Sequence, residues 1–400
     1  MQVKRSDRVP ARINYSKNDN IKPESLDQHS ASEILRTFTS ASKIPSSFTS
    51  FVLLSVFTLA NTFSLTHYFR KNVNYANEVW LGTGASFRVS VYKRAHHYWI
   101  TTLGLPTSQT LVSKMPILQR PGEAYDEKRL AMAILELRLL IHPPLANHEN
   151  IVQLKGIAWQ HSLDSPGVVV PCLLLEFAEY GTLSDLLRSK EDIPLKTKLS
   201  LLHDIALGLE ALHKCGIAQG DVKPDNILIF KHSKRRFIAK LADFGYSLLE
   251  NEENVYVGGT QAWKAPETIG KSVSRDLVPS TDLYSYGLLA WQVMLGQHSV
   301  FDHVSTGSRA SSYEDLELMK EKDIVLRKAI DWARQLDSDR SVFVIRLFKA
   351  TLPRDPKKRS LEEVLRAFWG DDENLQLERA MLMLFPLDLR KTIRGQTVSL

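Results

Sequence analysis

Cysteines are scarce, and neither stands where a metal site or a disulfide framework would need it. The 400 residues include two cysteines, Cys172 and Cys215, which lie far apart and form no CxxC pair. Disulfide-stapled domains and zinc sites require several such residues at short spacing. His142 and His148 have no third ligand spaced with them, so we interpret them as turn and packing residues. The sequence therefore argues against both kinds of site and fits a reducing compartment.

Long hydrophobic runs and blocks of one charge are missing as well. The most hydrophobic segment, residues 51–60, is shorter than the roughly 18 residues that a membrane helix needs. No apolar run follows the charged N-terminus, as a signal peptide would require. The net charge is +6, but residues 234–236 form only a short basic turn. We expect a soluble cytoplasmic protein, with the nucleus as an alternative, that has no membrane span and no nucleic-acid partner; the sequence sets no oligomeric state.

The two ends of the chain carry no recognisable chemistry. Residues 1–30 are polar and without a period, which is typical of a disordered tail. Residues 31–76 suggest two or three short helices, which would either dock on the following domain or form a surface for a partner. Residues 386–400 are interpreted as a C-terminal tail.

Hydrophobic periodicity divides the residues between these ends into two parts. Strand-like runs dominate residues 77–177, with one amphipathic helix near residues 125–141. Residues 178–385 are mainly helical. An apolar stripe that ends at Leu212 and His213 indicates a buried helix, and further helical patterns occupy residues 281–295, 313–333, 339–350 and 360–369. This order predicts an α+β protein with two lobes, a small β-rich N-lobe and a larger, mainly helical C-lobe.

One stretch places an acid, a lysine and an amide within a few residues. It reads Gln219-Gly220-Asp221-Val222-Lys223-Pro224-Asp225-Asn226 and precedes a short apolar strand. Pro224 biases Lys223 away from helix, so we expect a loop. A carboxylate, a fixed cation and an amide oxygen suit a reaction in which a hydroxyl loses a proton while phosphate charge and Mg²⁺ are held.

A glycine-rich turn lies near the start of the strand-rich part. Gly82 and Gly84 form a GxG pattern, which is a weak signal alone. Apolar and polar residues alternate from Phe87 onward, which predicts a strand and not the helix of a dinucleotide fold. A plain β-turn explains the glycines equally well in isolation; beside the loop at residues 219–226, a lid over phosphates is favoured.

A second acid follows a second apolar strand. Asp243 leaves the strand at residues 237–241 and enters a glycine turn, Asp243-Phe244-Gly245. A carboxylate in that position suits Mg²⁺, a hard cation that prefers oxygen ligands. Further along the chain, Ala265-Pro266-Glu267 closes the segment that begins at this turn.

In this order and spacing, the motifs resemble the catalytic domain of the eukaryotic protein kinases over residues 77–370. The loop is similar to the kinase pattern H-R-D-x-K-P-x-N, with Gln219 in place of His and Gly220 in place of Arg. Phe87 stands where the kinase lid over the ATP phosphates has its third glycine. The resemblance implies a two-lobed kinase fold and the cofactors ATP and Mg²⁺.

The resemblance implies a role for each polar group. Asp221 would accept the hydroxyl proton, and Lys223 would steady the transferring phosphoryl group. Lys114, in an apolar strand, would position ATP, and Glu136 would orient it through an ion pair; a surface lysine and an exposed helix acid are the alternatives. The ligands of Mg²⁺ would be Asn226 and Asp243.

Other residues are implied in binding and in the scaffold. Those around ATP are Leu81, Gly82, Gly84, Val89, Val112, Lys114, Leu175 as gatekeeper, Glu176 and Ala178 through their backbones, and Leu228. Thr260 would bond the catalytic acid and lysine and shape the substrate groove. Glu267 would pair with Arg359, and Asp282 would anchor the backbone of the catalytic loop.

The resemblance implies an ATP-dependent kinase that transfers the γ-phosphoryl group to Ser or Thr hydroxyls of protein substrates. Lys223 favours the Ser/Thr form, although residues 263–267 are similar to tyrosine kinases. Because no Arg precedes Asp221, a phosphorylated activation loop would find no cation there. We therefore expect activity that does not depend on such phosphorylation.

Two alternatives remain open. The first is a pseudokinase that acts as a nucleotide-binding scaffold or signalling adaptor. It is favoured by Phe87, Gln219 and Gly220, and opposed by the intact Lys114, Glu136, Asp221, Asn226 and Asp243. The second is a small-molecule kinase, which the activation segment and Asp282 disfavour.

Overall fold

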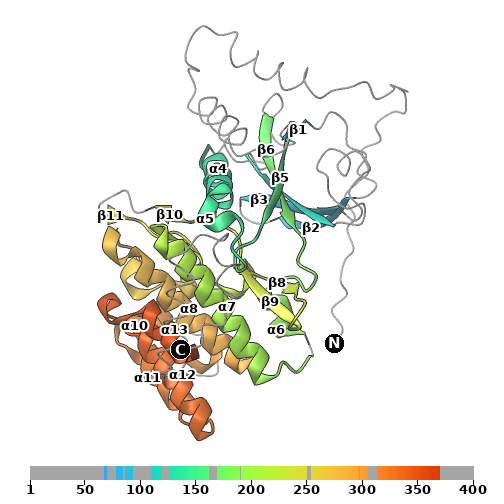
Figure 1. The fold of residues 1–400 in the computed structure, drawn as a ribbon. Helices are drawn as coiled ribbons and strands as arrows, with labels where there is room; N and C mark the ends of the chain where they lie inside the picture. The colour runs from blue at the N-terminus through green and yellow to red at the C-terminus, as the bar shows by residue number, and fades with distance from the viewer. Residues whose placement is uncertain are drawn as a thin grey trace, which may run out of the picture. The chain divides into compact units, whose positions relative to one another are not determined.

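The computed structural model describes residues 67–69, 78–83, 86–92, 110–118, 127–161, 169–189, 191–249, 254–296, 298–304 and 313–369. The predicted tails, most of the predicted helical extension and Gly84 lie outside these residues. In Figure 1, where colour follows residue number, strands β1–β6 have the blue to green colours of the first half of the chain. Helices α8–α13 have the yellow to red colours of the second half. The predicted α+β fold, with a β-rich lobe before a mainly helical lobe, is confirmed.

Six strands of the first lobe form one sheet in the order β1-β5-β6-β4-β3-β2. Neighbouring strands are antiparallel, except that β1 runs parallel to β5. Strands β2 and β3 form a hairpin around the glycine-rich turn, as the predicted strand–turn–strand pattern requires. The strands are β1 His67–Phe69, β2 Glu78–Thr83, β3 Phe87–Tyr92, β4 Leu111–Pro116, β5 Leu154–His161 and β6 Val169–Glu176.

Strand β1 overturns part of one prediction. The helical pattern assigned to residues 31–76 is wrong for His67–Phe69, which form a strand. His67 lies in register with Ile157 of β5. The edge of a sheet leaves backbone N–H and C=O groups unpaired, and a short extended segment can satisfy them. Periodicity did not reveal this strand because its partner lies far away in the sequence.

Helix α4 (Glu127–Ile141) packs on this sheet and confirms the helix predicted near residues 125–141. It contacts strands β4, β5 and β6. Its buried stripe has the spacing of one helix face and consists of Leu130, Ala133, Ile134, Leu137 and Leu140. Glu136 is completely buried beside this stripe. The short helix α5 (Pro143–Ala146) follows.

The second lobe is built around two helices that contact each other, α7 (Leu195–Lys214) and α8 (Val278–Leu295). Helix α8 is buried along most of its length. Trp291 of α8 lies in the core with its ring centroid 5.8 Å from that of Phe348. The other helices are α6 Leu183–Arg188, α9 Val300–Val304, α10 Tyr313–Glu321, α11 Ile324–Ala333, α12 Ser338–Thr351 and α13 Leu361–Trp369.

The helical pattern predicted for residues 313–333 corresponds to two helices, not one. Asp323 lies between α10 and α11 with a φ of 55°, in the left-handed region. A left-handed residue cannot continue a right-handed helix, so the pattern is interrupted there. Helices α6 and α9 were not anticipated because their six and five residues are less than two turns, too short for a period.

Short strand pairs bring the two predicted loops together. Strand β7 (Ile217–Ala218) pairs with β10 (Leu248–Leu249), and β8 (Ile227–Lys231) pairs with β9 (Phe237–Leu241). The loop at residues 219–226 ends where β8 begins, and Asp243 follows the end of β9. Because Ile227 lies in register with Leu241, both loops meet at the same end of this hairpin.

The remaining elements are short. Strands β11 (Asn254–Val255) and β12 (Val273–Ser274) form a further antiparallel pair. The 3-10 turns are η2 Pro224–Asn226, η3 Gln261–Trp263, η4 Pro266–Thr268, η5 Arg275–Leu277 and η6 Pro356–Lys358. Among the helices in the part of the chain that the structure describes, none is long and apolar enough to cross a bilayer.

Candidate active site

The loop at residues 219–226, which the sequence predicts to be catalytic, is held in place by Asp282 on helix α8. The Asp282 carboxylate is buried and accepts hydrogen bonds from the backbone N–H groups of Gln219 (2.8 Å) and Gly220 (2.9 Å). His213, at the end of α7, lies with its Nε2 2.9 Å from Asp282 Oδ2. The sequence pattern placed His213 in an apolar stripe, whereas its ring makes a polar contact with the anchor of the loop.

Gln219 joins the catalytic loop to the turn that carries Asp243. Its side chain is completely buried, and its Nε2 donates to the carbonyl oxygens of Ala242 and Asp243, each at 3.1 Å. Its Oε1 accepts the backbone N–H of Asp221 at 2.7 Å. A buried amide needs partners for both its ends, and here it has them. Gln219 therefore fixes the Asp243 turn relative to Asp221.

Gly220 occupies a position that only glycine fits. Its φ is 79°, and a Cβ atom placed on it would lie 2.3 Å from the carbonyl oxygen of Tyr246. Residues with a side chain rarely adopt such a φ, and a Cβ atom does not approach an oxygen atom so closely. The arginine that the kinase pattern has at this position could therefore enter only if the backbone at Tyr246 moved.

Asp221 lies at the centre of a hydrogen-bond network. Its Oδ2 is 2.7 Å from the Lys223 ammonium and accepts from Asn226 Nδ2 at 2.9 Å, while its Oδ1 accepts the backbone N–H of Thr260 at 2.8 Å. Lys223 also donates to Thr260 Oγ1 at 2.6 Å. The structure thus brings together all four residues that the sequence assigned to this centre. Asp221 is buried at 6% exposure, so the carboxylate is held in one orientation by these contacts.

Lys114 forms a second cluster with two acids. The residue lies on β4, and its Nζ is 2.6 and 2.8 Å from the two carboxylate oxygens of Glu136 on α4. The same Nζ lies 2.9 Å from Asp243 Oδ1. Lys114 and Glu136 are both buried, so the alternative of a surface lysine and an exposed helix acid does not hold.

The charges of Lys114 and Asp243 stabilise each other, whereas burial raises the pKa of Glu136 above its ordinary value in spite of the Lys114 charge. Burial acts to lower the pKa of the Lys114 ammonium, but the carboxylates of Asp243 and Glu136 more than offset it, and the pKa lies above its ordinary value. Burial acts to raise the pKa of Asp243, but the Lys114 charge and hydrogen bond outweigh it, and that pKa lies below its ordinary value. Both groups are therefore charged at neutral pH.

Asn226 and Asp243 offer the oxygen atoms that a hard cation requires. The backbone N–H of Ala242 donates to the carbonyl oxygen of Asn226 at 3.0 Å, which sets the two residues beside each other. Asn226 uses its Nδ2 on Asp221, which leaves its Oδ1 as the atom suited to a cation. Within the described ranges, no three His, Cys, Asp or Glu residues cluster as a full metal site. Two protein ligands completed by phosphate oxygens and water are what Mg²⁺ usually takes.

Four of the residues assigned to the nucleotide, Val89, Val112, Lys114 and Leu175, lie on one face of the sheet. In antiparallel pairs, residues in register point to the same face. Val89 is in register with Lys114, and Val112 with Leu175, which is 5% exposed. Leu81 is 56% exposed. Gly82 lies opposite Val89 in β2.

The chain then passes from β6 into the second lobe. Glu176 ends β6, and its carboxylate accepts from Lys240 Nζ at 2.7 Å and from the backbone N–H of Gln153 at 2.9 Å. Ala178 is buried, and Leu228 is half-buried and bridges to Thr182. The side chain and the backbone N–H of Glu176 are thus both engaged in the scaffold, since the N–H donates to the carbonyl oxygen of Gln153 at 3.1 Å.

The predicted ion pair of the scaffold is present. Arg359 holds Glu267 with two nitrogens, at 2.5 and 2.9 Å, and its side chain is completely buried.

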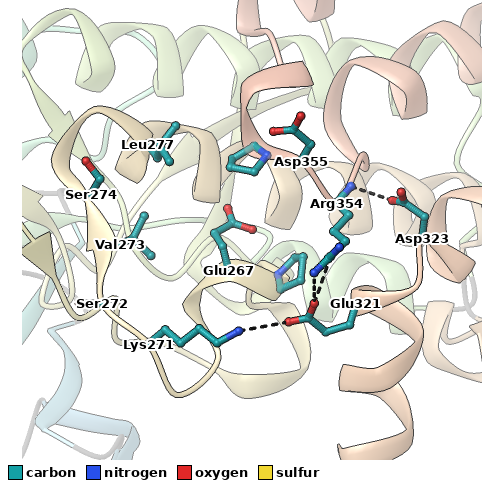
Figure 2. Close-up of a pocket in the computed structure, with 12 residues that line it drawn as sticks. Glu267, Lys271, Ser272, Val273, Ser274, Leu277, Glu321, Asp323, Arg354 and Asp355 are labelled. Atoms are coloured by element: carbon teal, nitrogen blue, oxygen red, sulfur yellow. Dashed lines mark hydrogen bonds and ion pairs between the residues drawn. The ribbon is translucent and has the colours of Figure 1, made fainter.

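A cavity of about 470 Å³ lies beside Glu267. Figure 2 shows Glu321 in this cavity between Lys271 and Arg354. None of the proposed catalytic residues lines it.

One buried lysine was missed by the sequence analysis. Lys320 of α10 is 1% exposed and donates to the backbone oxygens of Ala262 and Lys264, both at 2.7 Å. It thereby fixes the segment just before Ala265-Pro266-Glu267. A single lysine in an amphipathic helix gives no sequence signal for such a contact.

The architecture and the polar groups gathered at its loops define a kinase-like phosphotransferase fold. The protein kinase domain family matches residues 117–369, well over half of the chain. The chain belongs to the protein kinase family. The match begins after Lys114, so it does not cover the glycine-rich turn or this lysine.

Several kinases are similar to part of the chain. A probable serine/threonine-protein kinase, roco11 of Dictyostelium discoideum, is 31% identical over 220 residues, which are 53% of this chain and 13% of the relative. The serine/threonine/tyrosine-protein kinase HT1 of Arabidopsis thaliana is 30% identical over 184 residues, 45% of this chain and 42% of the relative. Receptor-interacting serine/threonine-protein kinase 3 of Rattus norvegicus is 32% identical over 161 residues, 38% of this chain and 32% of the relative. The chain thus covers less than half the length of each.

Proposed function

We propose that the chain is an active protein kinase that transfers the γ-phosphoryl group of ATP to Ser or Thr hydroxyls of proteins. The observation that carries this proposal is the joining of Lys114 to both Glu136 and Asp243. A kinase is competent only when the strand lysine, the helix glutamate and the metal-binding aspartate are all in place. The buried cluster supports the proposal because these three side chains are already in place relative to one another.

Asp221 is suited to the role of general base. A Ser or Thr hydroxyl that attacks the γ-phosphorus would give its proton to the Asp221 carboxylate, while the bond to the leaving ADP oxygen breaks. The Lys223 ammonium donates hydrogen bonds to Asp221 Oδ2 and to Thr260 Oγ1. Its charge would therefore lie beside the phosphoryl group during transfer. Lys223 thereby balances the negative charge that the transferring group carries.

Asn226 and Asp243 would hold Mg²⁺, which when bound neutralises charge on the phosphates. Lys114 would bind the α- and β-phosphates from the sheet side. The apolar side chains of Val89, Val112, Leu175 and Leu228 would enclose the base, and the backbones of Glu176 and Ala178 would bond its edge. Leu81 and the glycine-rich turn, Gly82 and Gly84, would cover the phosphates from above.

The Ser/Thr preference rests on Lys223 and its contact with Thr260. The relatives named above are serine/threonine kinases, with one described as serine/threonine/tyrosine, which supports the same preference. The substrates would be proteins, and we propose the cytoplasm as the place of action.

Activity would not require phosphorylation of the segment after Asp243. Gly220 has no cation to offer a phosphate, and the backbone of Tyr246 occupies the space in which an arginine side chain would begin. Treatment with a phosphatase is therefore expected to leave the transfer rate unchanged. A large loss of activity after treatment would refute this part of the proposal.

The same protein could instead be a scaffold that binds nucleotide without transfer, and one observation favours it: the ring of Phe87 lies over Lys114. Incubation with ATP labelled at the γ-phosphate, Mg²⁺ and a generic peptide mixture separates the two functions. We expect transfer by the wild type and loss of transfer in Asp221→Asn and Lys114→Met, with the exposed Lys196→Met unchanged. Nucleotide binding by all proteins with transfer by none would refute the kinase and support the scaffold.

A further inference from the structure

Phe87 has a side chain where the kinase lid has only a hydrogen atom. It is the first residue of β3 and lies on the same face of the sheet as Val89, since side chains alternate along a strand. Val89 is in register with Lys114, so Phe87 points to the face that carries this lysine. The ring is buried, with 4% exposure.

The ring makes contact with both halves of the proposed phosphate site. The Lys114 ammonium lies 4.2 Å from the ring centroid, within the range of a cation–π interaction. The ring also lies close to the turn, because a Cβ atom placed on Gly245 would lie 3.4 Å from Phe87 Cε2. Gly245 is two residues after Asp243, whose Oδ1 bonds Lys114. The aromatic ring therefore lies against both the lysine of one lobe and the Asp243 turn of the other.

The start of β3 is held in this position by its neighbours. The backbone oxygen of Ser86 accepts the N–H of Ile117 at 2.9 Å, and Ser86 Oγ lies 3.7 Å from the sulfur of Met132 on α4. The terminal methyl group of Met132 also reaches Gly245, since a Cβ atom placed on that glycine would lie 3.0 Å from Met132 Cε. Phe87 is thus part of a packed contact between β3, α4 and the turn, not a side chain that extends into solvent.

We infer that Phe87 fills the phosphate part of the nucleotide site, so that the conformation seen here admits a purine nucleoside but excludes a nucleoside triphosphate until the ring is displaced. This inference rests on the proposed function, because it takes Lys114 and Asp243 as the groups that hold phosphate and cation. A phosphate on Lys114 and a cation on Asp243 need the volume that the ring occupies. Phe87 then determines the selectivity between a nucleoside and a nucleoside triphosphate, and the free-energy cost of displacing its ring sets the affinity for ATP.

The test compares two ligands on three proteins. Calorimetry would measure the dissociation constants of Mg·ATP and of adenosine, which has no phosphate, for the wild type, Phe87→Gly and Phe87→Val. The valine variant keeps a strand-forming residue in case glycine weakens the hairpin. Ser90→Ala, on the opposite face of β3, is the control for general loosening of the strand.

We expect both Phe87 variants to bind Mg·ATP about 10- to 100-fold more tightly than the wild type, since burial of a phenylalanine ring is worth one to two decades in an equilibrium constant. The dissociation constant of adenosine is expected to change less than about 3-fold, well below the change expected for Mg·ATP, because adenosine has no phosphate to compete with the ring. Equal Mg·ATP affinity in the wild type and both Phe87 variants would overturn the inference, as would an equal gain in Ser90→Ala.

The result also separates this inference from the proposed function. Tight Mg·ATP binding by Phe87→Gly with no phosphoryl transfer would support the inference and refute the kinase activity. Tight binding and fast transfer by the wild type, with no gain in either Phe87 variant, would support the kinase activity and refute the inference.

Discussion

Replacement of Gly220 tests why the arginine of the kinase pattern is missing. The perturbation is Gly220→Ala, which adds a single methyl group at a φ of 79°. That methyl group would lie 2.3 Å from the carbonyl oxygen of Tyr246 and 3.1 Å from its carbonyl carbon. Both atoms belong to the backbone and cannot rotate away.

The magnitude has two parts, which a matched variant separates. Left-handed backbone costs a residue with a side chain roughly 1–2 kcal/mol relative to glycine. Overpacking adds about 1–3 kcal/mol when the neighbours cannot give way. Gly270 has a similar φ of 66°, but a Cβ atom there would have nothing within 4 Å. Gly270→Ala therefore carries the first part only, whereas Gly220→Ala carries both.

Urea unfolding of the wild type, Gly220→Ala and Gly270→Ala measures these differences as free energies of unfolding. We expect Gly220→Ala to be about 1–3 kcal/mol less stable than Gly270→Ala. Gly220→Arg is expected to be at least as unstable as the alanine variant and to gain no dependence on phosphorylation. Equal stability of the two alanine variants would refute the contact with Tyr246 as the reason for glycine.

Three further substitutions test the scaffold of the site. Gln219→Leu keeps the volume of the side chain but leaves the carbonyl oxygens of the Asp243 turn without donors, so we expect the free energy of unfolding to fall by about 2–4 kcal/mol. A fall no larger than that of the exposed Gln261→Leu would contradict this role of Gln219. Arg359→Met leaves its carboxylate partner unpaired, with an expected loss of about 3–5 kcal/mol; a loss below about 1 kcal/mol, as for an exposed pair, would refute the role of this ion pair. Burial lowers the pKa of Lys320 to about 7 from its ordinary 10.5. Between these two pH values the unfolded chain keeps a proton on Lys320 that the folded protein releases, so the contribution of Lys320 to the free energy of unfolding rises with pH from 7 to 10.5. Lys320→Met is expected to flatten that rise in a series of melts from pH 7 to 10; parallel curves for the two proteins would count against it.

The motifs made the polar centre predictable because their geometry is local. Asp221, Lys223 and Asn226 share one short loop, and a proline and a strand at its end leave few ways to arrange them. The pairing of Lys114 with Glu136 crosses elements, and it was implied by the resemblance to the kinase pattern; the apolar strand and the apolar helix face that carry the two residues are consistent with it.

Other features depend on contacts that the sequence does not encode locally. The reason for Gly220 lies in the backbone of Tyr246, and the position of the Phe87 ring depends on how the Asp243 turn meets the sheet. Gln219 was an unexplained substitution in the pattern, and its role became visible only through the two carbonyl oxygens it bonds. Strand β1 depends in the same way on the edge of β5.

Departures from a family pattern thus have physical causes that differ from one position to the next. At Gln219 an amide makes three hydrogen bonds within the loops. At Gly220 a backbone contact excludes any side chain. At Phe87 a ring occupies volume beside Lys114. The first two hold the catalytic loop, and only the third competes with a ligand.

The central claim is that Asp221 accepts the proton of the attacked hydroxyl, and its most direct test is the initial rate of γ-phosphoryl transfer from ATP to a Ser/Thr peptide mixture. The rate should be measured at saturating Mg·ATP for the wild type, Asp221→Asn and Asp225→Asn, since Asp225 lies on the same loop but is exposed. We expect Asp221→Asn to be slower by about 10²- to 10⁴-fold and Asp225→Asn to match the wild type. Transfer by Asp221→Asn at the wild-type rate, or no transfer by the wild type itself, would contradict the account.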